Sequence, residues 1–346
     1  HVRAKSGTRI EETARLVDQI DASIRSKIPA AEVDNILDNI GLPYSGINLM
    51  HATSGLIGAG DADIMVSLKE DHHPTADYVR QLRLDLPREF PTATFSFLPA
   101  DIITQILNFG LPAPIDIQID GTDIEHNRDV ANKILDEIRH VPGIADPRIE
   151  QAFDYPVLNI AVDRTKAMQA GLTQRQIGDN VLNSLSGSFQ ITPMFFLNHQ
   201  NGVNYNLVAQ PPQYDFRSLQ DLQNIPLIAQ PGQVPEILGD VASIKRSNEM
   251  EDVSHYNIRR VVDVYASVQD RDLGGVARDV QKIVDANRKL LPRGSFVTIR
   301  GQVDTMRNSY TSLLGGLAFS IVLVYMLIVV NFQSWLDPFI IITALP

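Results

Sequence analysis

The stretch SLLGGLAFSIVLVYMLIVV, residues 312–330, contains no charged side chain and almost no polar one. A helix needs about 20 predominantly apolar residues to cross the roughly 30 Å hydrocarbon layer of a bilayer. A core helix of this length in a soluble protein normally keeps a polar stripe, which is missing here. The sequence therefore predicts a transmembrane helix at residues 302–331. After a turn, residues 338–346 are predicted to begin a second span.

The rest of the 346-residue chain has the composition of a protein folded in water, with 44% hydrophobic and 21% charged residues. Its net charge of −11 argues against a nucleic-acid partner, because no basic surface could release counterions from phosphates. The absence of cysteine fits an extracytoplasmic location. Because the usual nucleophile, phosphate-loop and zinc-protease motifs are missing, we expect neither an enzyme nor a cofactor. The first residues read as the end of a strand, which predicts a piece of a longer protein.

Four segments of the chain repeat one pattern: an amphipathic helix, an apolar residue followed by proline, a turn and a strand. Proline has no amide hydrogen and clashes with the preceding turn, so it is expected to end each helix. The four helix ends are predicted at Ile28-Pro29, Leu86-Pro87, Val141-Pro142 and Leu291-Pro292. Capping boxes are predicted at Thr8–Glu11 and Thr122–Glu125.

Strands are expected on either side of each helix. Residues 115–120 show this best, because three isoleucines alternate with polar residues, as in a half-buried strand. Paired strand–helix–strand units form a split βαβ, ferredoxin-like subdomain. The predicted fold class is therefore α+β, with one ferredoxin-like subdomain at residues 1–105 and a second split between 106–156 and 256–301. Residues 157–255 would form an inserted α+β subdomain.

The insert is predicted to present a β-hairpin, because Asn201-Gly202 separates two strand-like runs. A capping-box spacing at Thr173 and Gln176 predicts a helix before it. Such a module suits docking to another protein better than catalysis. Candidate contacts with a neighbouring subunit or a tunnel protein are Asn198, Asn201, Gly202 and Tyr205.

Four segments, in matching order and spacing, resemble the second periplasmic half of a resistance–nodulation–division (RND) efflux permease. They are VDRTKAMQAGLT at 162–173, VPEILGDVA at 234–242, VSLK at 66–69 and FQSWLDP at 332–338. The resemblance implies a proton-driven, homotrimeric pump in the bacterial inner membrane, with most of this chain in the periplasm. It also implies two porter subdomains, a docking insert and the eighth membrane helix. A periplasmic adaptor and an outer-membrane channel would be its partners. The family's proton relay has no counterpart in residues 312–330.

Residues 41–60 form an uncharged segment with five glycines, longer than most loops without structure. By position it resembles the family's switch loop, although aliphatic residues replace most of that loop's aromatic ones. The resemblance implies apolar binding of amphiphilic compounds. The alternative is a loop packed on a neighbouring subunit, and core packing explains the two phenylalanines equally well. The candidate substrate-binding residues are Leu37, Tyr44, Ile47, Leu49, Met50, Leu56, Ile57, Met65, Phe95 and Phe97.

Two other functions stay open. Thioether ligands suit Cu(I) and Ag(I). The metal-exporting branch of the same family is therefore one alternative, based on Met50, Met65, Met168 and Met194. A membrane-anchored periplasmic binding or assembly protein without transport activity is the other. Adjacent histidines rarely converge on one ion, so residues 70–73 (EDHH) are predicted to be a solvated turn, and no metal-ligand set is proposed.

Overall fold

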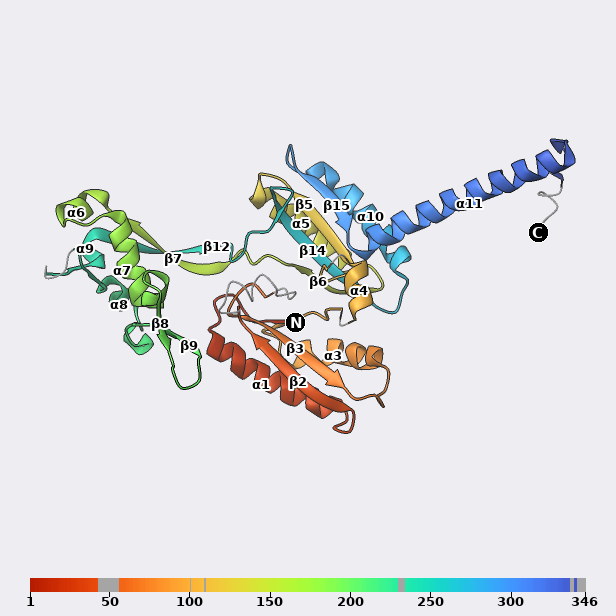
Figure 1. Cartoon of the computed structure of the whole chain (residues 1–346). Coiled ribbons are helices and arrows are strands. Elements are labelled where there is room, and N and C mark those ends of the chain that lie inside the picture. The colour runs from red at the N-terminus through yellow and green to blue at the C-terminus, as the bar shows by residue number, and fades with distance from the viewer. Residues whose placement is uncertain (43–55, 100, 109, 230–233, 337–338, 341–346) are drawn as a thin grey trace. The chain divides into compact units, whose positions relative to one another are not determined.

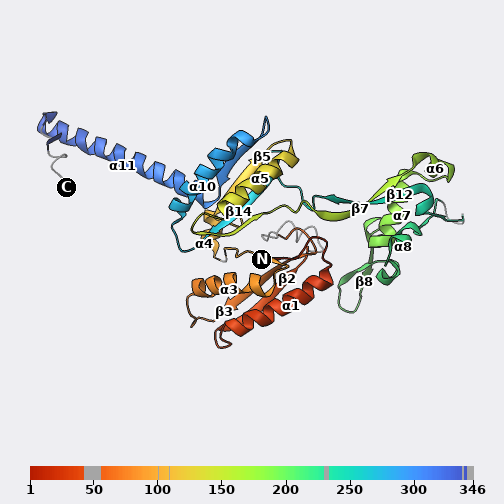
Figure 2. The same cartoon turned by 180° about the vertical axis from the view of Figure 1, so that it is seen from behind.

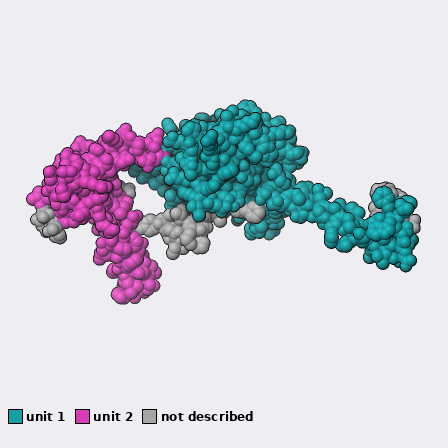
Figure 3. Space-filling view, turned by 90° about the horizontal axis from the view of Figure 1, so that it is seen from above, with its two compact units in different colours: residues 1–155, 250–346 teal, residues 156–249 magenta. Residues whose placement is uncertain are grey.

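A computed structural model describes residues 1–42, 56–99, 101–108, 110–229, 234–336 and 339–340. These residues divide into two compact units, which Figure 3 colours separately. Unit 1 contains residues 1–155 and 250–346, and unit 2 contains Pro156–Glu249. Unit 2 begins one residue before the insert predicted at 157–255 and ends six residues before it, and the domain bounds stay a prediction.

The first half of unit 1 is a ferredoxin-like sheet covered by two helices (Figure 1). The strand order is β2-β3-β1-β4, and the neighbouring strands are antiparallel. Its core gathers Ile20 and Ile24 of α1 with Leu82 and Leu86 of α3 against the sheet. The elements are β1 (Val2–Arg3), α1 (Ile10–Lys27), β2 (Val33–Ile40), β3 (Asp61–Leu68), α3 (Thr75–Glu89) and β4 (Thr94–Phe95).

The second half of unit 1 repeats this topology, with unit 2 inserted between its second and third strands. The strand β5 pairs with both β14 and β15, and β6 pairs with the other edge of β14. Ile115, Ile117 and Ile119 of β5 are fully buried against the helices α5 and α10. The elements are β5 (Ile115–Asp120), α5 (Ile124–Ile138), β6 (Ile144–Ile149), β13 (His255–Tyr256), β14 (Arg259–Val268), α10 (Leu273–Asn287) and β15 (Phe296–Arg300).

Unit 2 has its own small core around Ile177, Ile225, Leu227 and Leu238. The predicted capping box of Thr173 and Gln176 is present at the start of α7. The main elements are β7 (Tyr155–Val162), α6 (Arg164–Gln169), α7 (Gln174–Ser186), β8 (Met194–Leu197), β9 (Asn204–Leu207), α8 (Leu219–Gln223), β10 (Pro226–Leu227), β11 (Glu236–Ile237), α9 (Leu238–Val241) and β12 (Ala242–Glu249).

The helix α11 (Gln302–Phe332) follows β15 and contains the apolar stretch. Only Val303 and Val329 are buried along it, and an 18-residue window reaches a mean hydropathy of 2.7. It is the one helix among the described residues that is long and apolar enough to cross a membrane. A short helix, α4 (Ile102–Leu107), connects the two halves of unit 1.

Three predictions of helix ends were wrong in detail. At α1, Thr8 donates its hydroxyl to the carbonyl of Lys5, so the expected capping box does not form. At α5 the cap is Asp123, whose carboxylate accepts from the amide of His126 at 3.3 Å. The helix α3 continues past Pro87 to Glu89, because proline near a helix end costs only one hydrogen bond.

Candidate functional site

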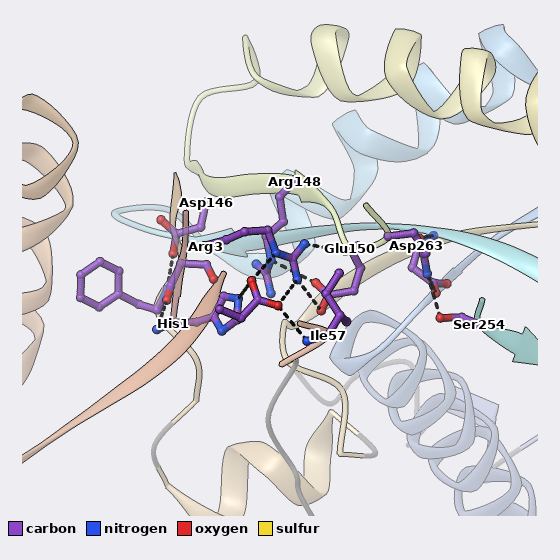
Figure 4. Close-up of polar contacts among 12 residues, drawn as sticks. His1, Arg3, Ile57, Asp146, Arg148, Glu150, Ser254 and Asp263 are labelled. Atoms are coloured by element: carbon purple, nitrogen blue, oxygen red, sulfur yellow. Dashed lines mark hydrogen bonds and ion pairs between the residues drawn. The ribbon is translucent and has the colours of Figure 1, made fainter. Parts of the chain in front are cut away.

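The two sheets of unit 1 are joined by a buried ion pair (Figure 4). Arg3 on β1 donates from Nε to Oδ1 of Asp61, at the start of β3, over 2.8 Å. The same guanidinium donates from Nη1 to the backbone carbonyl of Glu150, just after β6, over 2.6 Å. Arg3 therefore links the first ferredoxin-like sheet to the second.

Further hydrogen bonds fix both carboxylates of this cluster. The amide of Ile57 donates to Oδ2 of Asp61 over 2.7 Å, and Nε of Arg148 donates to Oε2 of Glu150 over 3.3 Å. The Arg148 guanidinium also lies 5.4 Å from the ring centre of Tyr265. Buried ion pairs persist only when such additional bonds satisfy the remaining lone pairs, as they do here.

A second acidic pair on β3 faces the same region. Nδ1 of His1 lies 2.8 Å from Oδ1 of Asp63, and Nε2 of His1 lies 4.0 Å from Asp61. Asp61 and Asp63 are both buried. The structure surrounds both carboxylates with the basic partners His1 and Arg3.

Two acidic side chains of the second sheet, Asp116 and Asp263, are also buried. Asp263 accepts from Gln151 over 2.9 Å and from Gln118 over 3.1 Å. Asp116, one strand away, is fully buried, and neither of its oxygens has a hydrogen-bond partner among the described residues. Burial, followed by the nearby charge of Asp263, raises the pKa of Asp116 well above its usual range.

A cavity of about 210 Å³ lies beside the ion-pair cluster. Three of its lining residues are arginines, and none is a carboxylate or a methionine. This lining favours water or an anion over a metal cation. The lining residues are His1, Arg3, Thr94, Ser96, Leu135, Arg139, Pro147, Arg148 and Ile149.

The structure places the predicted substrate-binding residues on different surfaces. Leu37 and Met65 are cross-strand partners on β2 and β3, and their side chains are 58% and 49% exposed. Phe95 and Phe97 pack instead against the helix-covered core of the same sheet. The sheet thus brings Leu37 and Met65 together and separates them from the two phenylalanines.

The other predicted residues have different surroundings. Leu56 is buried, and Ile57 is held through its amide to Asp61. Tyr44, Ile47, Leu49 and Met50 lie outside the described residues.

The predicted docking residues lie at the turn between β8 and β9. Gly202 has a φ of +72°, which favours glycine, and the side-chain Nδ2 of Asn201 donates to the Tyr205 hydroxyl over 3.3 Å. Asn198 accepts from the amide of Gln200 over 2.9 Å. The hairpin exposes eight large apolar side chains: Met194, Phe195, Phe196, Leu197, Val203, Tyr205, Leu207 and Val208.

No three His, Cys, Asp or Glu side chains converge on a possible metal position in the part of the chain that the structure describes. Met65 lies on β3 of unit 1, whereas Met168 and Met194 lie on α6 and β8 of unit 2. In the turn at residues 70–73, His73 binds Glu32, with 2.6 Å between Nδ1 and Oε1. The histidine pair is thus part of a structural turn.

The ion-pair cluster was not predicted from the sequence. Its members come from β1, β3 and the end of β6, which are far apart along the chain. The only local signal was the pair of acids at 61 and 63, which resembles ordinary surface acids in a chain this acidic.

A family model described as the AcrB/AcrD/AcrF family matches residues 1–346. The cobalt-zinc-cadmium resistance protein CzcA of Cupriavidus metallidurans is 21% identical over 98% of this chain and 32% of its own length. The cation efflux system protein CusA of Escherichia coli is 25% identical over 70% of this chain and 22% of its own length.

A similar solved structure is the crystal structure of a heavy metal efflux pump. It superimposes with a TM-score of 0.78 at 20% identity, covering 97% of this chain and 34% of that one. This likeness concerns the fold. The chain spans about a third of the length of the first of these relatives.

Proposed function

Because the chain belongs to the AcrB/AcrD/AcrF family of RND transporters, we propose that it is a periplasmic portion of an inner-membrane efflux pump. Members of this family are transporters and not enzymes. In this proposal unit 1 supplies two porter subdomains, unit 2 is the docking subdomain, and α11 crosses the membrane.

We propose heavy-metal cations as the cargo of the pump. The observation that carries this is the set of relatives, which includes a cobalt-zinc-cadmium resistance protein and a cation efflux protein. This replaces amphiphilic compounds as the preferred cargo. In this conformation Arg3 neutralises Asp61 and Glu150, so a cation that bound to these two carboxylates would first have to displace the arginine.

The test is expression of the full-length parent pump, with its adaptor and channel, in a strain that lacks its own metal and drug exporters. We expect growth at higher concentrations of cobalt, zinc, cadmium, copper or silver than in a vector control. Susceptibility to dyes and detergents should not change. Protection against dyes and detergents alone would overturn the cation proposal.

Amphiphilic compounds remain a second candidate cargo, supported by one observation. Leu37 and Met65 form an exposed apolar pair on the two strands that flank the uncharged segment at residues 41–60 in the sequence. If these side chains bind substrate, Met65→Ala should change susceptibility unevenly among compounds in the same strain. Leu84→Ala, at an exposed leucine on α3, is the matched control.

We also propose a homotrimer that works with a periplasmic adaptor and an outer-membrane channel, in which the β8–β9 hairpin contacts a neighbouring protein. The support is its exposed apolar surface, which is unusual for a two-stranded hairpin in water. A photocrosslinking amino acid at position 205 should give a crosslinked product, whereas the same amino acid at exposed Asp77 should not. The mass of the product distinguishes a second pump subunit from a tunnel protein.

A further inference from the structure

The short helix α4 exposes an unusual amount of apolar surface. Ile102, Ile103 and Ile106 are 73%, 71% and 68% exposed, and no residue of the helix is buried. Asp101 caps the helix by accepting from the amide of Thr104 over 2.7 Å. The helix is therefore formed, but these three isoleucines are mostly exposed in the described part of the chain.

The position of α4 connects it to the membrane helix. The hydroxyl of Thr305, in the second turn of α11, donates to the carbonyl of Leu107 at the end of α4 over 2.9 Å. Both Figure 1 and Figure 2 draw α4 beside the first turns of α11. Ser312, where the uncharged apolar stretch begins, lies seven residues after Thr305, or about 10 Å along a helix.

The lack of charged side chains within and just after α4 is compatible with contact between this helix and lipid. From Ile102 to Ile115 the sequence contains no charged side chain. On α11, Leu313, Leu314 and Leu317 are 57–68% exposed, as expected for side chains that face lipid. The end of α4 thus lies about 10 Å along α11 from the predicted hydrocarbon edge, in the region where interfacial helices lie.

We propose that α4 lies in the periplasmic surface of the membrane, with Ile102, Ile103 and Ile106 inserted among the lipid headgroups and upper acyl chains. This inference rests on the proposed function, since it requires α11 to cross the membrane. It adds a second lipid contact, which would fix unit 1 against the bilayer beside the first turns of α11.

The absence of cysteine makes a depth measurement direct. One nitroxide label would be attached to each of three single-cysteine variants of the whole chain, Ile103→Cys, Leu313→Cys and Leu84→Cys. Each labelled variant would be reconstituted in phosphatidylethanolamine–phosphatidylglycerol liposomes. Collision rates with oxygen, which partitions into lipid, and with a water-soluble nickel complex report the depth of each label. All three native side chains are more than half exposed, so the labels should not disturb packing.

At position 313 we expect the highest ratio of oxygen collisions to nickel collisions. At position 84 we expect the low ratio of a label that is surrounded by water. The ratio at position 103 should exceed that at 84 by about threefold or more, as for a side chain at the interface. A lipid-like label at 313 with a water-like label at 103 would overturn this inference and leave the proposed function standing. A water-like label at 313 would overturn both. A label at 103 shielded from both colliders would overturn the lipid contact in favour of a protein contact.

Discussion

At the scale of single residues, Asp21 on α1 is a carboxyl group whose ionisation works against the fold. Burial, followed by the negative charge of Asp38 on β2, raises the pKa of Asp21 to about 6. The folded pKa lies above the ordinary value of 3.8, so the protonated carboxyl is the form that the fold favours. Its contribution to the free energy of unfolding is fully present below about pH 4. It is lost as the pH rises through about 6.

We expect Asp21→Asn to increase the free energy of unfolding by about 1 kcal/mol at about pH 8, after allowance for solvent screening at this partly exposed site. At about pH 4 the gain should be small, because the native carboxyl is then largely protonated. Thermal unfolding of the purified chain in detergent measures both values. Asp34→Asn, at an exposed position of β2, is the control. A gain of equal size at both pH values would contradict the explanation.

Glu32 shows the opposite shift. The Tyr78 hydroxyl, at 2.6 Å, and then the amide of His73, at 2.9 Å, lower the pKa of Glu32 to about 2. This stabilisation is present above the ordinary value of 4.5 and is lost as the pH falls toward about 2. Glu32→Gln should therefore melt at a lower temperature than the native chain at about pH 7, with a smaller difference at about pH 3. The control variant Glu70→Gln, at an exposed position in the same turn, should have the melting temperature of the native chain at both pH values.

At the scale of elements, α3 is tied to β6 by one arginine. Arg83 contacts the carboxylate of Asp146 at 2.7 Å from Nη2 and 3.0 Å from Nε, and donates from Nη1 to Gln269 over 2.6 Å. Asp146 has a φ of +50° and lies where the register between β6 and β14 shifts. Such bulges redirect a side chain, and this one directs Asp146 toward α3.

We expect Arg83→Met to destabilise the chain by about 3 kcal/mol or more, because it leaves the buried Asp146 carboxylate without its cation. Asp146→Asn should recover part of this loss in the double variant, which a double-mutant cycle would measure as coupling. Arg80→Met is the matched control on the same helix. Its pair with Asp270 is exposed, so its loss should cost less than about 1 kcal/mol. Equal costs for the two arginines would contradict this assignment.

The strand β5 shows what local pattern can and cannot predict. The alternation of its isoleucines predicted the strand at residues 115–120, and the structure has it there. The same alternation suggested that the polar residues between them face water. Asp116 is instead fully buried. Period two identifies two faces of a strand, but what covers the second face depends on distant residues.

At the scale of the whole molecule, the repeated helix–proline–strand pattern predicted the pair of ferredoxin-like folds, and the comparisons confirm this fold class. The ion-pair cluster could not be predicted in the same way. Arg3, Asp61 and Glu150 meet only after both sheets have formed, and nothing in the sequence near any of them specifies the others. The preference for metal relatives was equally hidden, because scattered methionines do not define a metal site.

The insertion of unit 2 leads to a prediction about folding. Its core is contained within Pro156–Glu249, where Ile177, Ile225, Leu227 and Leu238 are almost fully buried. Its two ends meet in the pairing of β7 with β12, so excision leaves no distant strand unpaired. We therefore expect residues 156–249, expressed alone, to fold with dispersed amide resonances and a cooperative thermal transition. Ile177→Ala should lower its stability by about 2–5 kcal/mol, whereas Leu185→Ala, at an exposed position of the same helix, should change it little. A disordered spectrum for the isolated unit would mean that its core depends on unit 1.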